Sequence, residues 1–137
     1  MTTGISGAGR EAERRFREAT GASKPGQAAD GDAVLAGHRI EIKQTSTNTL
    51  NQVRPVKYLP LVVLDTRTYN WYVVPPDEIV RLAAGRVQRQ HTENPFESVT
   101  VSLSKIDGFD VPEEQLRAAT LAAVERGDSQ PHLRDAM

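Results

Sequence analysis

Residues 30–44 read Asp-Gly-Asp-Ala-Val-Leu-Ala-Gly-His-Arg-Ile-Glu-Ile-Lys-Gln and carry the pattern of a β-hairpin. In the second half of this stretch, Ile40 and Ile42 alternate with polar residues, which is the period-two pattern of a strand with one buried face. Ala36 and Gly37 lie between the two halves, where a tight turn is needed. The sequence therefore predicts two short antiparallel strands that fold back on each other at these two residues.

A two-residue turn at positions 36 and 37 also fixes the register of the hairpin. Position 35 then faces 38, 34 faces 39, 33 faces 40, and Asp32 faces Glu41. Two carboxylates on directly opposed strand positions repel each other unless a cation lies between them. Lys43 follows on the same strand face as Glu41. This register predicts a metal site at Asp32 and Glu41. A longer turn would shift the register, and the two carboxylates would then no longer face each other.

The composition describes an ordinary globular chain. Its 137 residues suffice for one domain with one core, and 38% hydrophobic and 26% charged residues are typical of water-soluble proteins. No apolar run approaches the length of a membrane span, and we expect no signal peptide. The absence of cysteine fits the reducing cytoplasm, where we expect the protein. A net charge of -1 gives no global signal for a nucleic-acid partner.

The remaining elements follow from periodicity and from turn residues. We expect a helix over 9–19, a polar connector over 45–58 with a short helix near 50–53, strands over 59–65 and 70–75, a helix over 76–84 ended by Gly85, a strand over 96–104 and a helix over 110–127. Residues 1–8 are expected to form a flexible arm and 128–137 a flexible tail. This order predicts an α/β fold with a mixed central sheet flanked by helices.

The pattern Asp32-x8-Glu41-Ile-Lys43 resembles the motif of the PD-(D/E)XK nuclease superfamily, in which Gly31 would replace the proline. That group includes type II restriction endonucleases, Holliday-junction resolvases and DNA-repair nucleases. An acid-x-Lys triplet arises by chance roughly once in a chain of this length, so its context carries more weight. The order of helix, hairpin, buried strand and helix over roughly residues 9–84 is similar to the family's core.

The resemblance implies a restriction endonuclease-like core and a set of catalytic residues. Asp32, Glu41 and the main-chain carbonyl of Ile42 offer the hard oxygen ligands that Mg²⁺ prefers, with Mn²⁺ as a substitute. Lys43 would orient or deprotonate the attacking water and stabilise the charge of the transition state. Glu13 matches a glutamate of the family's first helix that often helps to hold metal. In the alternative interpretation, the hairpin lies on the surface and Lys43 merely pairs with Glu41.

Polar side chains after the motif are candidates for DNA contacts. They are Gln44, Gln52, Arg54, Lys57, Arg89, Gln90 and His91. Cationic side chains bind phosphates, and amide side chains can read base edges. The alternative is a solvated connector without a ligand.

These observations together favour a metal-dependent DNA endonuclease, closest to a type II restriction endonuclease. Because a single small domain cuts one strand, a homodimer on double-stranded DNA is the expected assembly. The nearest alternative is a structure-selective nuclease such as a Holliday-junction resolvase. A non-catalytic binding module of the same fold, and an unrelated α/β domain whose hairpin is acidic by chance, remain as alternatives from other classes.

Overall fold

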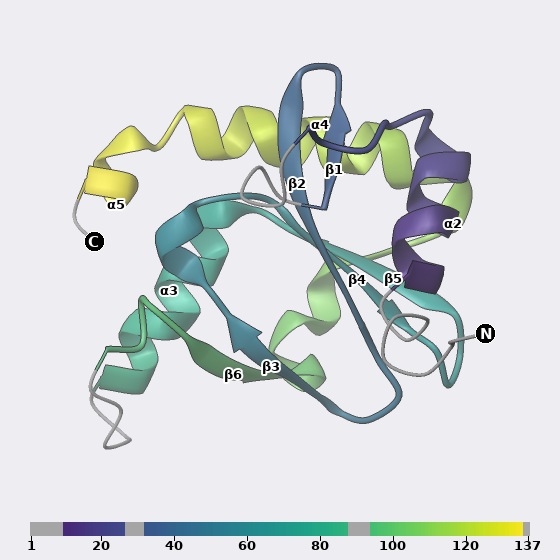
Figure 1. Ribbon diagram of the computed structural model, residues 1–137. Helices are drawn as coiled ribbons and strands as arrows, with labels where there is room; N and C mark the ends of the chain where they lie inside the picture. The colour runs from purple at the N-terminus through teal and green to yellow at the C-terminus, as the bar shows by residue number, and fades with distance from the viewer. Residues whose placement is uncertain (1–9, 27–31, 88–93, 136–137) are drawn as a thin grey trace.

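A five-stranded mixed sheet forms the centre of the computed structural model, which describes residues 10–26, 32–87 and 94–135 (Figure 1). Its strands, in spatial order, are β1 (Ala33–Leu35), β2 (His38–Thr45), β4 (Leu61–Asp65), β5 (Asn70–Val74) and β7 (Asp110–Val111). Strands β2 and β4 run parallel, and the other neighbouring pairs are antiparallel. The predicted α/β class, with a mixed sheet flanked by helices, is confirmed.

The β1–β2 hairpin has the predicted turn and register. Residues 33, 34 and 35 pair with 40, 39 and 38, respectively. Ala36 and Gly37 both have positive φ angles, 51° and 83°. Positive φ at both central residues defines the turn whose twist matches that of two antiparallel strands. The turn therefore sets the register on which the metal-site prediction depends.

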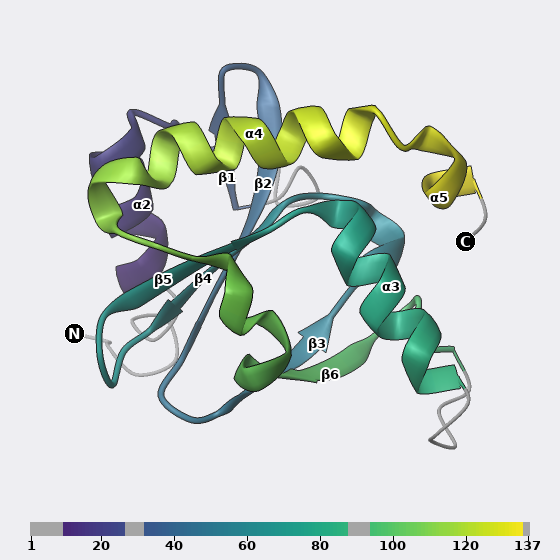
Figure 2. The ribbon, with the colours of Figure 1, turned by 180° about the vertical axis from the view of Figure 1, so that it is seen from behind.

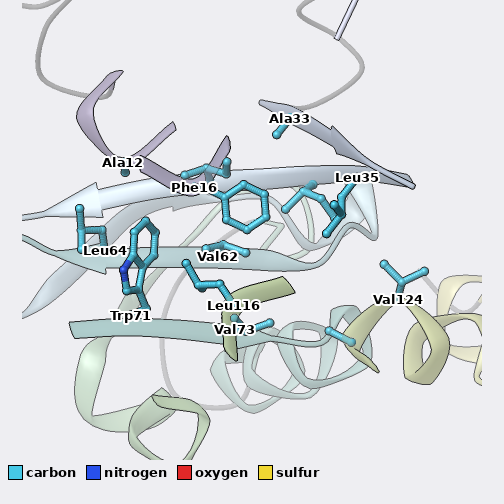
Figure 3. Close-up of a cluster of buried hydrophobic side chains, with 13 residues drawn as sticks. Ala12, Phe16, Ala33, Leu35, Val62, Leu64, Trp71, Val73, Leu116 and Val124 are labelled. Atoms are coloured by element: carbon cyan, nitrogen blue, oxygen red, sulfur yellow. The ribbon is translucent and has the colours of Figure 1, made fainter. Parts of the chain in front are cut away.

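Helices α2 (Arg10–Thr20) and α4 (Leu116–Asp128) cover one face of the sheet (Figure 2). Figure 3 shows the core of this layer, where Phe16 lies beside Val62 and Leu116 lies between Val62 and Val73. Phe16, Val62 and Leu116 are fully buried. Their packing fixes α2 and α4 against the sheet that carries the candidate site.

The opposite face is covered by helix α3 (Pro76–Val87), the 3₁₀ segment η3 (Leu103–Phe109) and a two-stranded ribbon. The ribbon pairs β3 (Thr49–Val53) with β6 (Val99–Ser102). Alternate residues of β4 enter the two cores, which confirms the prediction of a strand buried on both faces.

The prediction for the polar connector was wrong. Residues 50–53, expected as a short helix, belong to β3, and the turn of helix falls at η2 (Pro55–Lys57). Leu50 and Val53 are both buried, at a spacing that resembles a helical stripe. A register shift between them, with Gln52 at a φ of 57°, produces this spacing in a bulged strand.

Several element boundaries also differ from the prediction, and β4 begins at Leu61 rather than at residue 59. Helix α3 runs through Gly85 to Val87, because Gly85 lies on an exposed part of the helix and costs only backbone entropy there. The strand expected over 96–104 is limited to β6. The last helix starts later than expected, after β7 and η4 (Glu113–Gln115), since Pro112 has extended backbone angles.

Part of the expected C-terminal tail is helical, as α5 (Pro131–Asp135). The Tyr58 hydroxyl donates to the carbonyl oxygens of Gly127 and Gln130, and the Arg134 guanidinium lies 5.7 Å from the Tyr58 ring centroid. These contacts hold the end of the chain against η2. The expected N-terminal arm, 1–8, lies outside the described residues. None of the described helices is long and apolar enough to cross a membrane.

Candidate metal and nucleic-acid site

Asp32 lies where the β1–β2 ladder ends. The last paired positions are Ala33 and Ile40, and the Asp32 N–H donates to the Ile40 carbonyl at 2.9 Å. Beyond this point β1 offers no main-chain carbonyl to β2, and the Asp32 carboxylate accepts the hydrogen bond instead. Its Oδ2 atom accepts a hydrogen bond from the main-chain N–H of Ile42 at 2.9 Å. The side chain is therefore held against β2 by a bond to the strand itself.

The main-chain groups of Ile42 face the edge of β2 where Asp32 lies. The Glu41 N–H bonds to the Pro60 carbonyl on the β4 side, at 3.0 Å, so the next residue along the strand faces the other way. Because the N–H and C=O of one strand residue point to the same side, the Ile42 carbonyl is directed toward the Asp32 edge. A third oxygen thus faces the edge that carries the two carboxylates.

The pKa of Glu41 is raised by its surroundings. Burial raises its pKa above the ordinary 4.5, and the charge of Asp32 and a hydrogen bond between the two carboxyl groups raise it further, while Lys57 and Lys43 lower it. Its Oε1 atom is buried and has no hydrogen-bond partner. The nearest cation is Lys57, whose Nζ lies 3.6 Å from that oxygen. The site therefore holds two interacting carboxylates with an unsatisfied buried oxygen.

A pocket of about 430 Å³ opens beside Glu41. Five residues predicted from the sequence line it together with Glu97 and Ser98; they are Glu41, Lys43, Gln52, Arg54 and Lys57. They come from three elements: β2 supplies two of them, β3 supplies Gln52, and the remaining two lie at η2. The parallel crossover from β2 to β4 passes through β3 and η2, and this path brings the connector residues back over the motif strand.

Lys43 also lines a second hollow, of about 530 Å³, on its other side. Hydroxyl and amide side chains dominate this wall: Gln44, Thr45, Ser46, Thr47, Thr49, Asn51 and Thr66. Lys43 therefore lies between a charged hollow and a polar, uncharged one. The two hollows share this lysine and form a polar surface along β2 and β3.

Gln44 has a structural contact that the sequence did not reveal. Its Oε1 atom accepts the main-chain N–H of Ala12 at 3.0 Å, in the first turn of α2. The neighbouring Glu13 is half-buried on that helix. In the part of the chain that the structure describes, no group of three or more acidic or histidine side chains could hold a metal ion. The metal-binding role of Glu13 stays a prediction.

The donor set fits a hard divalent cation. Asp32 and Glu41 supply carboxylates, the Ile42 carbonyl faces the same edge, and one Glu41 oxygen lacks a hydrogen bond. Mg²⁺ commonly binds through one or two carboxylates and keeps several waters, which a phosphate can replace. Two carboxylates beside an open pocket meet this requirement.

The predicted site differs in two ways from what the structure describes: three predicted residues lie outside the described ranges, and part of the pocket wall was not predicted. Arg89, Gln90 and His91 lie outside the described residues, and their DNA contacts stay a prediction. Glu97, which accepts hydrogen bonds from Arg54 at its carbonyl and at Oε1, was not predicted. The opposed charges of residues 54 and 97 carry no signal of contact until β3 and β6 are recognised as a pair.

The chain was also compared with known proteins. No protein-family model matches it, and no curated protein is significantly similar to it.

Proposed function

We propose that this protein is a metal-dependent DNA endonuclease that hydrolyses phosphodiester bonds, in the manner of the PD-(D/E)XK nucleases. One observation carries the proposal: Asp32 and Glu41 interact with each other, and Glu41 lines a pocket together with Lys43 and two further cations. Carboxylate pairs with an adjacent lysine are suited to holding a divalent cation and a scissile phosphate at one point.

Each residue of the motif has a separate task in this proposal. Asp32, Glu41 and the Ile42 carbonyl hold the cation, which supplies polarisation of the phosphoryl oxygen and a water of lowered pKa. Lys43, half-buried on the same strand face as Glu41, holds the attacking water and stabilises the negative charge that develops on the phosphate. No covalent intermediate with the protein is required.

The pocket wall supports a nucleic-acid substrate. Lys57 and Arg54 present cations that can neutralise phosphates, although Arg54 is also held by Glu97 at 2.8 Å. Gln52 and Asn51 are exposed at the bulge of β3, and an amide side chain can make two hydrogen bonds to adenine in the major groove. We therefore propose double-stranded DNA as the substrate and a type II restriction endonuclease as the closest functional class.

Cleavage of two strands at one place requires two active sites. We propose a homodimer in the cytoplasm, with one site acting on each strand. A small chain with one pair of candidate metal-binding carboxylates, Asp32 and Glu41, is suited to one phosphodiester at a time.

The test is a comparison of substrates in Mg²⁺ and in EDTA. The purified protein would be incubated with phage DNA, with a four-way DNA junction whose arms carry sequences of that DNA, and with a single-stranded RNA. Discrete metal-dependent fragments of the phage DNA support the restriction class. Cleavage of the junction alone would replace that class by a structure-selective nuclease, and cleavage of RNA alone would contradict a DNA enzyme.

A further inference from the structure

We propose that Lys57 is a positioning residue that holds Glu41 in the metal-free protein, is released from it by a divalent cation and then faces the scissile phosphate. This inference rests on the proposed function, because it concerns the same site: Glu41 exchanges its contact with Lys57 for a divalent cation. It gives Lys57, on η2, a role toward Glu41 in addition to the DNA contact that the sequence suggested.

The ion pair between Lys57 and Glu41 is incomplete. Nζ and Oε1 are 3.6 Å apart, beyond hydrogen-bonding distance, and the buried Oε1 atom has no hydrogen-bond partner. A buried carboxylate oxygen without a hydrogen bond is costly to the folded state. The contact is therefore close enough to reduce the repulsion from Asp32 and loose enough to be exchanged for a better ligand.

The backbone at Lys57 is fixed from both sides. Its N–H donates to the Arg54 carbonyl at 3.1 Å, and the N–H of Val56 donates to the Phe96 carbonyl at 2.8 Å. Tyr58, which follows, has a left-handed backbone with a φ of 51°. Its hydroxyl is anchored by two carbonyls near the end of α4. Exchange can therefore proceed by rotation of the Lys57 side chain alone, on a rigid support.

The other cation of the wall does not offer the same exchange. The Arg54 guanidinium donates to the carbonyl oxygen of Glu97 and to its Oε1, so its position is set by the turn before β6 rather than by the acidic pair. When Glu41 binds a divalent cation, its charge is shared and the two positive centres repel each other. The Lys57 ammonium then moves into the pocket, which it lines with Lys43, and a phosphate is the ligand that both ammonium groups can bind.

The first measurement needs no metal. Thermal unfolding would be compared for the wild type, Lys57→Met, Glu41→Gln and the double variant, in EDTA. Lys57→Met is expected to lower Tm in the wild-type background and to leave Tm unchanged in the Glu41→Gln background. Equal effects of Lys57→Met in both backgrounds would show that the lysine does not hold Glu41, and would overturn the first half of the proposal.

The second measurement is calorimetric titration with Mn²⁺ at about pH 8, where proton competition for the carboxylates is small. Lys57→Met is expected to bind Mn²⁺ roughly three- to tenfold more tightly than the wild type, while Lys57→Arg restores wild-type affinity. Arg54→Met is the matched control, because it removes a cation of the same pocket that pairs with Glu97, and its Mn²⁺ affinity should change less.

The outcomes distinguish this inference from the proposed function. Wild-type binding of Mn²⁺ with unchanged or weaker binding in a folded Lys57→Met protein overturns the exchange and leaves the nuclease proposal in place. Absence of Mn²⁺ binding in both proteins overturns the metal site itself, and the exchange with it. Tighter binding combined with slower DNA cleavage in Lys57→Met supports both, since a purely structural lysine would not tighten metal binding.

Discussion

The Asp32 carboxylate accepts a hydrogen bond from the main-chain N–H of Ile42, with Oδ2 and N 2.9 Å apart. This bond attaches one candidate metal ligand directly to the strand that carries the other, Glu41. The Asp32 carboxylate is thus positioned by the backbone of β2 rather than by a free side-chain rotamer. Such pre-organisation leaves two negative groups close together, and its consequences for stability can be measured.

Glu41→Gln should stabilise the metal-free protein at neutral pH by about 1 kcal/mol, because it removes a buried charge beside Asp32. The pKa of Glu41 is raised, so its ionisation disfavours the folded state. The penalty is absent below its ordinary pKa of 4.5 and develops as the pH rises through the higher pKa of the folded state. In urea unfolding with EDTA, the free energy of unfolding of the variant should rise relative to that of the wild type as the pH increases over this range. A constant difference at all pH values would contradict the prediction.

Asp65 and Arg67 should show the opposite pH dependence. Hydrogen bonds from the Arg67 side chain, at 3.0 Å to each carboxylate oxygen, hold the pKa of the buried Asp65 below its usual 3.8. Their stabilisation is present above that value and is lost as the pH falls through the lower pKa of the folded state. Arg67→Ala should destabilise the protein at neutral pH, because it removes these hydrogen bonds. Thermal unfolding of both proteins should converge under acid; a gap that persists there would contradict the assignment.

Two glycines in helices should respond to alanine in opposite directions. A Cβ on Gly127 would lie 2.5 Å from Cγ of Pro76, and this overpacking should destabilise the protein by about 1–3 kcal/mol. A Cβ on Gly85 meets nothing within 4 Å, so Gly85→Ala should stabilise α3 by roughly 0.5–1 kcal/mol. Urea unfolding of the pair checks the α3–α4 contact. Equal effects of the two substitutions would mean that these helices do not pack as described.

Gln44→Ala should act on stability rather than on DNA affinity. Gln44 Oε1 accepts the N–H of Ala12, so its loss leaves a first-turn donor of α2 without its acceptor and should cost about 1 kcal/mol. Gln44→Glu keeps an acceptor and should be tolerated. Tm and DNA affinity, measured without metal, distinguish the roles. A large loss of DNA affinity with unchanged Tm would instead support the contact that the sequence suggested.

The hairpin could be predicted from the sequence because its signal is local. Alternating Ile40 and Ile42, with Ala36 and Gly37 at the turn, specify the strand and its register without reference to the rest of the chain. The placement of Asp32 at the end of the ladder follows from this register. The buried strand β4 could also be predicted, because a continuous apolar run is recognised without knowing which strands pair with it.

The pocket wall was less predictable because it depends on contacts distant in sequence. Leu50 and Val53 fit a helical spacing as well as a bulged strand, and only pairing with β6 decides between them. The ion pair of Lys57 with Glu41 and the contact of Gln44 with Ala12 both require the crossover and α2 to be in place. The residue types therefore indicated the chemistry of the site. Which residues contact each other could be told only from the fold.

The most direct test of the nuclease proposal is cleavage of supercoiled plasmid in Mg²⁺ or Mn²⁺ by the wild type and by three variants. These are Asp32→Asn, Glu41→Gln and Lys43→Met, with Lys105→Met as a control on an exposed lysine of η3. We predict metal-dependent cutting by the wild type and the control, abolished by EDTA and reduced at least about 100-fold in each folded site variant. Cutting that survives these three substitutions, or no cutting by the wild type in either metal, would contradict the account.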